Sequence, residues 1–323
     1  MRAWVWRAVG AALVAMLSAA GGTFASAAGG TLAGAPHPVR VAPRQLLAMS
    51  CPSRRQCTAV GDSGLVVTFD PLAPARRRVS TIDAGHSLFG IACVSRKQCS
   101  VSANPGRELT FDPERPAGVS SRLLLPGTDF STVACATRRR CVMIADTREV
   151  TFDPLSPSDH IYAELPGGNV SRVACPSAAQ CTAVDFSGGE VTFDPRTPRS
   201  NAPAMLLAND GLSGVSCPSA HQCTAIGQGG NAVTFDPSAP AAAITAAVDP
   251  HTEALVDDIS CPSRAQCTLI DGGGPEFTFD PLSPGRASRV NLHVSADVLA
   301  LACPASTQCT VIDGTREVTF NPR

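Results

Sequence analysis

Cysteine is the residue type whose spacing in this sequence points most clearly to a chemistry. The 14 cysteines fall into pairs with the same short interval between their members. Such pairs could form disulfides or bind zinc, but a zinc site needs four ligands that converge on one point. Well-separated pairs do not supply that cluster, so we predict a disulfide within each pair. The pairs are Cys51–Cys57, Cys93–Cys99, Cys135–Cys141, Cys175–Cys181, Cys217–Cys223, Cys261–Cys267 and Cys303–Cys309.

Charged side chains form two groups that could bind a ligand. Carboxylates recur at one kind of turn, where they could hold a cation or line a ligand site near a channel mouth, or simply cap hairpin turns. They are Asp62, Asp146, Asp185, Asp271 and Asp313, with Glu108, Glu149, Glu190, Glu276 and Glu317 nearby. Arginines cluster in the first three repeats, where they could contact an anionic polymer or form a solvated surface. We expect one acidic and one basic end of the molecule. The possible binding face comprises Arg76, Arg77, Arg78, Arg138, Arg139, Arg140, Asp271 and Asp313.

No arrangement of catalytic residue types emerges from the sequence. A nucleophile, a base and an orienting group must converge on one site, whereas the six histidines fall at unrelated places in the chain. Gly272-Gly273-Gly274 joins two expected strands and so is not a phosphate-binding loop. We therefore assign no catalytic residue, no cofactor and no metal. Asp159-His160 and Asp257-Asp258 are the local oddities that we single out for inspection.

The cysteine pairs belong to a unit that repeats along the chain. Successive first cysteines are 42, 42, 40, 42, 44 and 42 residues apart. A fixed period of about 40–45 residues is the length of a four-stranded propeller blade. Short apolar and β-branched runs alternate with Gly, Pro, Asn and Ser, which predicts strands joined by turns. The sequence therefore predicts an all-β fold, a seven-bladed β-propeller with four-stranded blades.

The second repeat illustrates the four strands, A to D, that we expect in each blade. We place them at 88–93, 99–103, 108–112 and 120–125, with the two cysteines at the facing ends of strands A and B. The last repeat stops after its strand C, and a strand at 38–41 precedes the first repeat. A propeller must close its ring or leave a sheet edge exposed. We therefore predict that the N-terminal strand completes the last blade.

Three further repeated positions have expected roles in the fold. A phenylalanine in strand C should pack between blades, and the Asp or Asn after it should cap the next turn. The Gln before the second cysteine, replaced by Arg140 in the third repeat, should hydrogen-bond the backbone of the A–B connection. The phenylalanines are Phe69, Phe111, Phe152, Phe193, Phe235, Phe279 and Phe320.

The repeated run L-x-x-V-x-C-P-S-x-x-Q-C-T-A-V-G resembles repeats of actinobacterial secreted propeller proteins. It is also similar to the unit of Asp-box propellers and of photosystem II assembly factor-like propellers. The chain has Thr-Phe-Asp-Pro where the Asp-box consensus has S-x-D-x-G-x-T-W. The resemblance implies the propeller fold.

The N-terminal residues have the pattern of a secretory signal. Arg2 and Arg7 precede an apolar run, and Ala25-Ser26-Ala27 forms a small-residue cleavage signal. The apolar run is too short to span a bilayer, so we expect no membrane span. We assign 1–27 to a signal peptide, 28–37 to a short flexible linker and 38–323 to the propeller. The protein should be a monomer, secreted or associated with the cell wall.

The composition favours binding over catalysis. The formal net charge of −1 argues against nucleic acid as the main partner. Both tryptophans lie in the signal peptide and Tyr162 is the only tyrosine, so carbohydrate stacking on aromatic rings is disfavoured. We predict a non-catalytic binding or scaffolding module for an extracellular protein or a cell-wall polymer. The alternatives are an extracellular lyase or hydrolase with an acidic site at the channel mouth, and a degenerate paralogue with a purely structural role.

Overall fold

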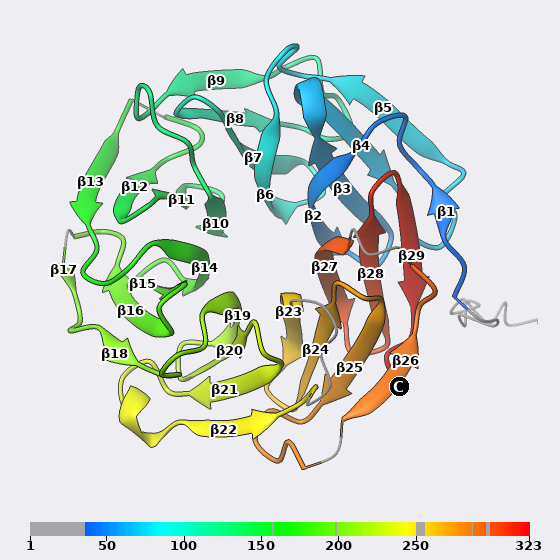
Figure 1. Ribbon diagram of the computed structural model, residues 1–323. Helices are drawn as coiled ribbons and strands as arrows, with labels where there is room; N and C mark the ends of the chain where they lie inside the picture. The colour runs from blue at the N-terminus through cyan, green and yellow to red at the C-terminus, as the bar shows by residue number, and fades with distance from the viewer. Residues whose placement is uncertain (1–35, 157, 198, 250–255, 286, 295–297) are drawn as a thin grey trace, which may run out of the picture. The chain divides into compact units, whose positions relative to one another are not determined.

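Seven antiparallel sheets surround a central axis in the computed structural model (Figure 1). It describes residues 36–156, 158–197, 199–249, 256–285, 287–294 and 298–323. The predicted signal peptide and most of the predicted linker lie outside these residues. No helix in the described ranges is long and apolar enough to cross a membrane. The predicted seven-bladed propeller is confirmed.

The strands of blades 1 to 6 follow one another along the chain. Blade 1 contains β2 (Leu46–Ser53), β3 (Gln56–Gly61), β4 (Leu65–Phe69) and β5 (Arg77–Thr81). Blade 2 contains β6 (Leu88–Ser95), β7 (Gln98–Ala103), β8 (Arg107–Phe111) and β9 (Ser120–Leu123), and blade 3 contains β10 (Thr132–Thr137), β11 (Arg140–Ala145), β12 (Arg148–Phe152) and β13 (His160–Glu164). Blade 4 contains β14 (Val170–Ser177), β15 (Gln180–Asp185), β16 (Gly189–Asp194), β17 (Arg199–Ser200) and β18 (Ala204–Met205).

Blades 5 and 6 repeat this order, and blade 7 takes its fourth strand from the N-terminal part of the chain. Blade 5 contains β19 (Leu212–Ser219), β20 (Gln222–Gly227), β21 (Asn231–Phe235) and β22 (Ile244–Ala247). Blade 6 contains β23 (Val256–Ser263), β24 (Gln266–Asp271), β25 (Pro275–Phe279) and β26 (Ser288–Asn291), and blade 7 contains β27 (Val298–Ala305), β28 (Gln308–Asp313), β29 (Arg316–Phe320) and β1 (Val39–Arg40). Two 3₁₀ turns, η1 (Asp62–Gly64) and η2 (Pro240–Ala242), lie in connections. The first strand of every blade lies nearest the axis (Figure 1).

All seven predicted disulfides are formed, with Cα–Cα distances of 4.0–4.1 Å. Their position in the hairpin differs from our expectation. In blade 2, Cys93 pairs with Cys99, but the ladder continues past a β-bulge to the pair Ser95 and Gln98. The cysteines therefore lie inside the A–B hairpin rather than at its strand ends. Seven such bridges indicate an oxidising, extracellular-type environment.

The N-terminal strand closes the ring as predicted. β1 pairs antiparallel with β29, with Val39 opposite Glu317. The backbone N–H groups of Val41 and Ala42 both donate to the carbonyl oxygen of Thr315, at 3.0 Å. Val41 is fully buried, in a cluster that joins blades 1 and 7.

Replacing Val41 with aspartate should open this closure. The substitution buries a charged group among apolar side chains, so we expect the free energy of unfolding to fall by about 3 kcal/mol or more. Urea unfolding measures the loss. Arg44→Asp is the control, because Arg44 is exposed nearby. Equal midpoints for the two variants would show that the N-terminal segment does not hold the ring together.

Each joint between neighbouring blades has its own hydrophobic cluster. The cluster between blades 1 and 2, for example, combines Val60 and Val66 with Leu109 and Phe111. The repeated phenylalanines are all at most 5% exposed and lie in these clusters, as predicted. The Asp or Asn after each phenylalanine accepts a backbone N–H two residues later at 2.8–3.2 Å, so the predicted turn caps are also confirmed.

In every blade except the third, the repeated glutamine joins its blade to the next one. Gln56 Nε2 donates to the carbonyl oxygen of Arg96 in blade 2, and Arg96 Nε donates back to Gln56 Oε1, both at 2.9 Å. Gln308 and Arg54 make the same reciprocal contact between blades 7 and 1. The glutamine does bond backbone, as expected, but this backbone belongs to the A–B turn of the following blade. The ring is therefore held by polar clamps as well as by its core.

Candidate functional site

The expected acidic end of the propeller is largely absent from the surface. The Asp residues of the B–C turns and the nearby Glu residues of strand C were expected to be exposed there. Eight of these ten carboxylates are at most 8% exposed, because turn geometry or strand alternation directs them inward. The eight are Asp185, Asp271, Asp313, Glu108, Glu149, Glu190, Glu276 and Glu317.

The buried aspartates belong to the turns themselves. Asp185 accepts the backbone N–H groups of Gly168, Ser187 and Gly189 at 2.7–3.0 Å. Asp271 accepts the N–H of Gly273 at 2.6 Å and is 2% exposed. Asp313 is 3% exposed. In this structure Asp271 and Asp313 are therefore not surface groups.

Five glutamates lie in the gaps between blades, an arrangement that we call the glutamate belt. In blades 1 and 5 the strand position of these glutamates is occupied by Val66 and Ala232. Both of these apolar side chains pack against the next blade, which shows the direction in which this position points. Burial raises the pKa of Glu108 and Glu276 to about 8, against a smaller opposing effect of a threonine hydroxyl. The belt comprises Glu108, Glu149, Glu190, Glu276 and Glu317.

Burial is also the main cause of the raised pKa in the other members of the belt. The pKa of Glu149, Glu190 and Glu317 is about 7, again with a threonine hydroxyl opposing the shift. The second carboxyl oxygens of Glu108, Glu190 and Glu276 are buried and have no hydrogen-bond partner among the described residues. The environment thus favours the neutral carboxyl.

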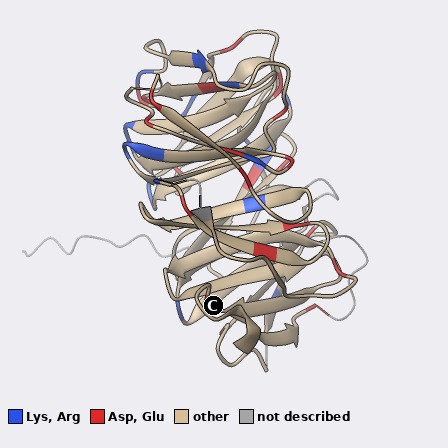
Figure 2. Cartoon of the chain, turned by 90° about the vertical axis from the view of Figure 1, so that its left-hand side faces the viewer, with Lys and Arg blue, Asp and Glu red and all other residues tan. Residues whose placement is uncertain are grey.

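The structure divides the predicted basic face into two parts. Arg138 Nε donates to Gln98 Oε1 in a blade clamp at 3.0 Å, and Arg139 forms an ion pair with Asp153 at 3.0 Å. Arg140 lies near Asp194 and contributes to the lowered pKa of that carboxyl, although Arg196 is the main cause. These three arginines have partners within the fold. In Figure 2, Lys and Arg gather along the upper left edge of the propeller.

The other part of the basic face is a groove between blades 1 and 2, which we call the arginine groove. It has a volume of about 410 Å³. Arg55 pairs with Asp70 at 3.3 Å and Arg96 with Glu114 at 3.1 Å. Three consecutive arginines, one just before β5 and two at its start, are exposed and form no ion pair within the described ranges. The arginines of the groove are Arg55, Arg76, Arg77, Arg78 and Arg96.

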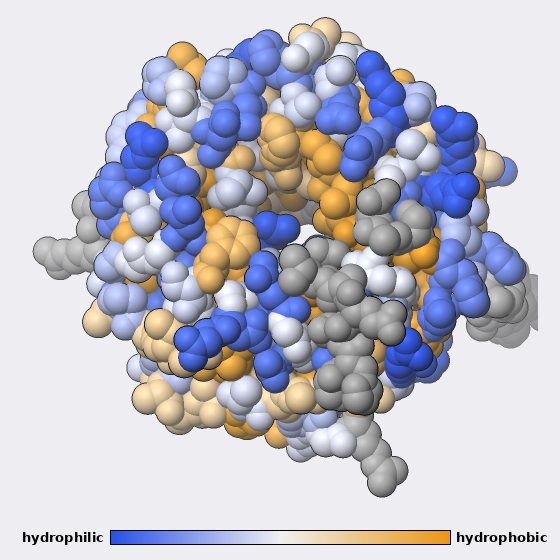
Figure 3. Space-filling model, viewed as in Figure 1, coloured by the Kyte–Doolittle hydropathy of each residue, from blue (hydrophilic) through white to orange (hydrophobic). Residues whose placement is uncertain are grey.

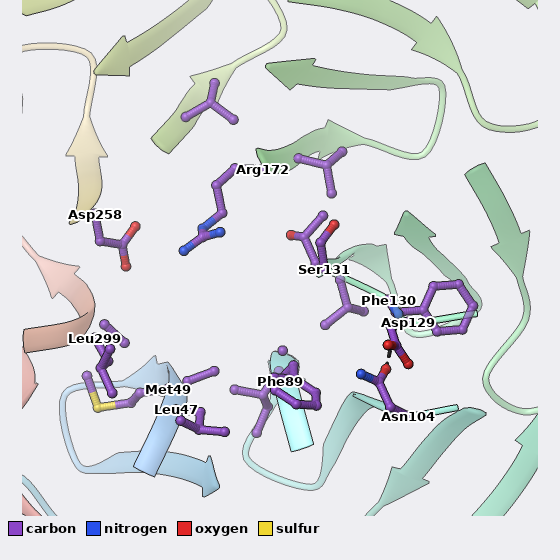
Figure 4. Close-up of a pocket in the computed structure, with 18 residues that line it drawn as sticks. Leu47, Met49, Phe89, Asn104, Asp129, Phe130, Ser131, Arg172, Asp258 and Leu299 are labelled. Carbon is purple, nitrogen blue, oxygen red and sulfur yellow. Dashed lines mark hydrogen bonds between the residues drawn. The ribbon is translucent and has the colours of Figure 1, made fainter. Parts of the chain in front are cut away.

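A second cavity, of about 460 Å³, opens at the centre of the ring. Residues from the first strands of all seven blades line it, together with the connection before β10. In Figure 3 the strongly hydrophobic residues at the central opening lie on the side of β2, with hydrophilic residues across from them. Arg172 and Asp258 point into the cavity (Figure 4). We call it the channel mouth.

Only one of the two charged residues that point into this cavity was singled out from the sequence. Asp258 belongs to one of the two oddities singled out there, whereas Arg172 was not noticed. An alignment of the repeats on their cysteines would have found both, because each stands three residues before the first cysteine of its blade. The other oddity, His160, contacts the hydroxyl of Tyr162 at 2.6 Å on the outer strand β13. No group of metal-binding side chains occurs among the described residues.

Comparison with known proteins gives the class of the fold. No protein-family model and no curated protein matches this sequence. The structure of YCF48 bound to D1 peptide has 12% identity and a TM-score of 0.70, covering 90% of this chain and 96% of that one. YCF48 from Cyanidioschyzon merolae has 13% identity and a TM-score of 0.69, covering 90% and 99%.

One further solved structure, U3-55K, is also similar to this chain. U3-55K has 7% identity and a TM-score of 0.76, and the alignment covers 90% of this chain and all of that one. At such identities the likeness shows the fold alone. The expected similarity to photosystem II assembly factor-like propellers therefore holds at the level of the fold. The chain is a seven-bladed β-propeller with a disulfide in every blade.

Proposed function

We propose that this protein is a secreted, non-catalytic binding module whose arginine groove receives an acidic segment of an extracellular protein. The observation that carries the proposal is the asymmetry of the ring. Arg76, Arg77 and Arg78 stand in blade 1 only, at a strand that is mostly uncharged in the corresponding part of the other repeats. A residue that serves the fold recurs in every blade, whereas a binding surface has no reason to recur.

The charges of the groove favour an anionic partner. Asp70 and Glu114 neutralise two of its five arginines, which leaves Arg76, Arg77 and Arg78. Guanidinium groups bind carboxylates through paired, charge-assisted hydrogen bonds. One of the similar propellers is described with a bound peptide, and a peptide segment is the partner class that we favour. The disulfides support an extracellular location, and attachment to the cell wall is part of the same proposal.

Neutralising the three arginines should remove this binding. The test is a titration of the folded protein with a fluorescent glutamate-rich peptide at low and at physiological salt. Because each charge-assisted bond contributes about 1.5–3 kcal/mol, Arg76→Gln, Arg77→Gln and Arg78→Gln together should weaken binding by roughly tenfold or more. The affinity of the wild type should also fall with salt.

The matched control replaces three exposed arginines of other blades with glutamine, namely Arg115, Arg148 and Arg316. This variant has the same net charge as the groove variant, so non-specific attraction changes equally in both. Equal weakening in the two variants would contradict the proposal. Tight binding of an anionic polysaccharide, with none of the peptide, would instead favour a cell-wall polymer as partner.

A further inference from the structure

The channel mouth contains two charged residues at a repeat position where the other blades have uncharged ones. Three residues before the first cysteine, five blades carry a small residue or threonine. Arg172 and Asp258 occupy this position in blades 4 and 6. The fold does not require a charge there, because the other blades form the same strand without one. The five uncharged residues are Ala48, Gly90, Thr132, Gly214 and Ala300.

The guanidinium of Arg172 has more N–H donors than its one hydrogen bond to the described residues uses. Its Nη1 donates to the carbonyl oxygen of Ser171 at 2.9 Å. No carboxylate among the described residues lies within ion-pair distance of its guanidinium. The side chain is half-buried and points toward the middle of the cavity (Figure 4). Its remaining N–H groups can therefore bind a carboxylate that enters from solvent.

Asp258 faces Arg172 across the cavity. Its carboxylate accepts the backbone N–H groups of Ile259 and of Leu301 in blade 7, both at 2.9 Å. Each carboxylate oxygen has a second lone pair, so the group can still accept a bond from a ligand. Burial raises its pKa, while Arg172 and the two N–H groups act in the opposite direction. Asp129, exposed at the same mouth, adds a second carboxylate.

The rim of the cavity is divided into an apolar and a polar half. Four residues before the first cysteine, blades 7, 1 and 2 carry Leu299, Leu47 and Phe89, and the Phe89 side chain is 40% exposed. Blades 3 to 5 carry serine at this position; Ser131 lines the cavity, whereas Ser171 and Ser213 are not among its lining residues. These serine hydroxyls donate to backbone carbonyls of their own and the following blade at 2.6–3.5 Å. The apolar half has no such role and remains open to a ligand.

We propose that the channel mouth binds a small zwitterion with apolar side chains, such as a free dipeptide. Arg172 would hold its carboxylate, Asp258 its ammonium group, and the apolar half its side chains. One cation and two carboxylates disfavour a purely anionic ligand, and they disfavour a purely apolar one because of the desolvation cost. A volume of about 460 Å³ lies within the range of ordinary small-molecule sites. This site is separate from the arginine groove, so either can be present without the other.

Leucyl-leucine is the probe, titrated into the folded wild-type protein by calorimetry. We expect saturable binding that weakens by about tenfold or more when the carboxyl end is amidated or the amino end is acetylated, because each change removes one charged contact. Glycyl-glycine, which lacks the apolar side chains, should also bind more weakly. These comparisons leave the protein unaltered, so no loss can come from misfolding.

Variants then assign the contacts. Arg172→Gln should weaken leucyl-leucine by about tenfold or more and abolish the difference between the free and the amidated dipeptide. The groove variant, with glutamine at Arg76, Arg77 and Arg78, should bind the dipeptide like the wild type. Absence of saturable binding at millimolar dipeptide would overturn the proposal. Equal affinities for the free, amidated and acetylated forms would overturn it as well.

Discussion

The melting temperature of this propeller is expected to fall as the pH rises from about 5 to about 8, because the folded state binds protons that the unfolded state releases. Replacing Glu108, Glu149 and Glu276 with glutamine should raise the melting temperature at pH 8 by about 5 °C or more, on the usual relation between stability and melting temperature for large domains. It should also flatten the decline with pH. Differential scanning calorimetry across this pH range measures both effects.

The sign of this effect follows from the raised pKa of each buried glutamate. The ordinary value of 4.5 becomes about 8 for Glu108 and about 7 for Glu149 in the folded protein. The stabilisation of the folded protein by each protonated glutamate is complete below the pKa that the glutamate has in the unfolded chain. It is lost as the pH rises through the pKa that the glutamate has in the folded protein. A displacement of this size corresponds to a few kcal/mol per group, on the order of 1 kcal/mol per pH unit. Asp194 and Asp236 have lowered pKa values in the folded protein. Their contribution to stability is therefore lost as the pH falls, at more acid pH.

The chain offers its own controls for this prediction. Blades 1 and 5 carry Val66 and Ala232 at the belt position, so an apolar side chain is compatible with the joint. Glu108→Val should therefore also reduce the pH dependence. Glu164→Gln changes the same chemical group on the exposed outer strand β13 and should leave the pH dependence unchanged. If the triple glutamine variant melted at pH 8 like the wild type, the belt would not control stability.

Much of the fold could be predicted from sequence because it is repeated. The spacing of the cysteines alone gave the number of blades and the disulfide pairing, since a constant period requires identical local structure. The glutamates of strand C were expected at the surface but are buried, and the reason is physical. Glu149 stands next to a turn in the sequence, but alternation along β12 directs it with Thr151 toward the neighbouring blade. Sequence proximity to a turn is therefore a poor guide to exposure in a strand that is covered on both sides.

The candidate sites were harder to predict because they depend on departures from the repeat. Arg138 and Arg76 look alike in the sequence, yet Arg138 clamps two blades through Gln98 while Arg76 has no partner of this kind. That difference appears only when the A–B turn of one blade is placed beside the next blade. Arg172 and Asp258 are more than 80 residues apart, and only the closed ring brings them to one cavity. Ring closure is thus what creates both the joints and the channel mouth.

Complete reduction of the disulfides should destabilise the protein more than any single substitution considered above. Each bridge closes a short loop with a sequence separation of 6 and contributes about 2 kcal/mol in the chain-entropy treatment. The seven together are comparable with the whole free energy of unfolding of a typical domain, about 5–15 kcal/mol. We expect protein reduced in denaturant and refolded with a reductant to be largely unfolded at 37 °C, as circular dichroism would show.

Removing one bridge separates the role of a single blade from that of the whole set. Cys135→Ala with Cys141→Ala should cost about 2 kcal/mol and leave a folded ring, because the clusters and clamps of the other joints remain. The second cysteine of every pair is at most 1% exposed, so a reductant should act slowly on the native protein and quickly after denaturation. A fully reduced chain as stable as the oxidised one would show that the core and the clamps are sufficient for stability. The disulfides would then no longer support an extracellular location for this protein.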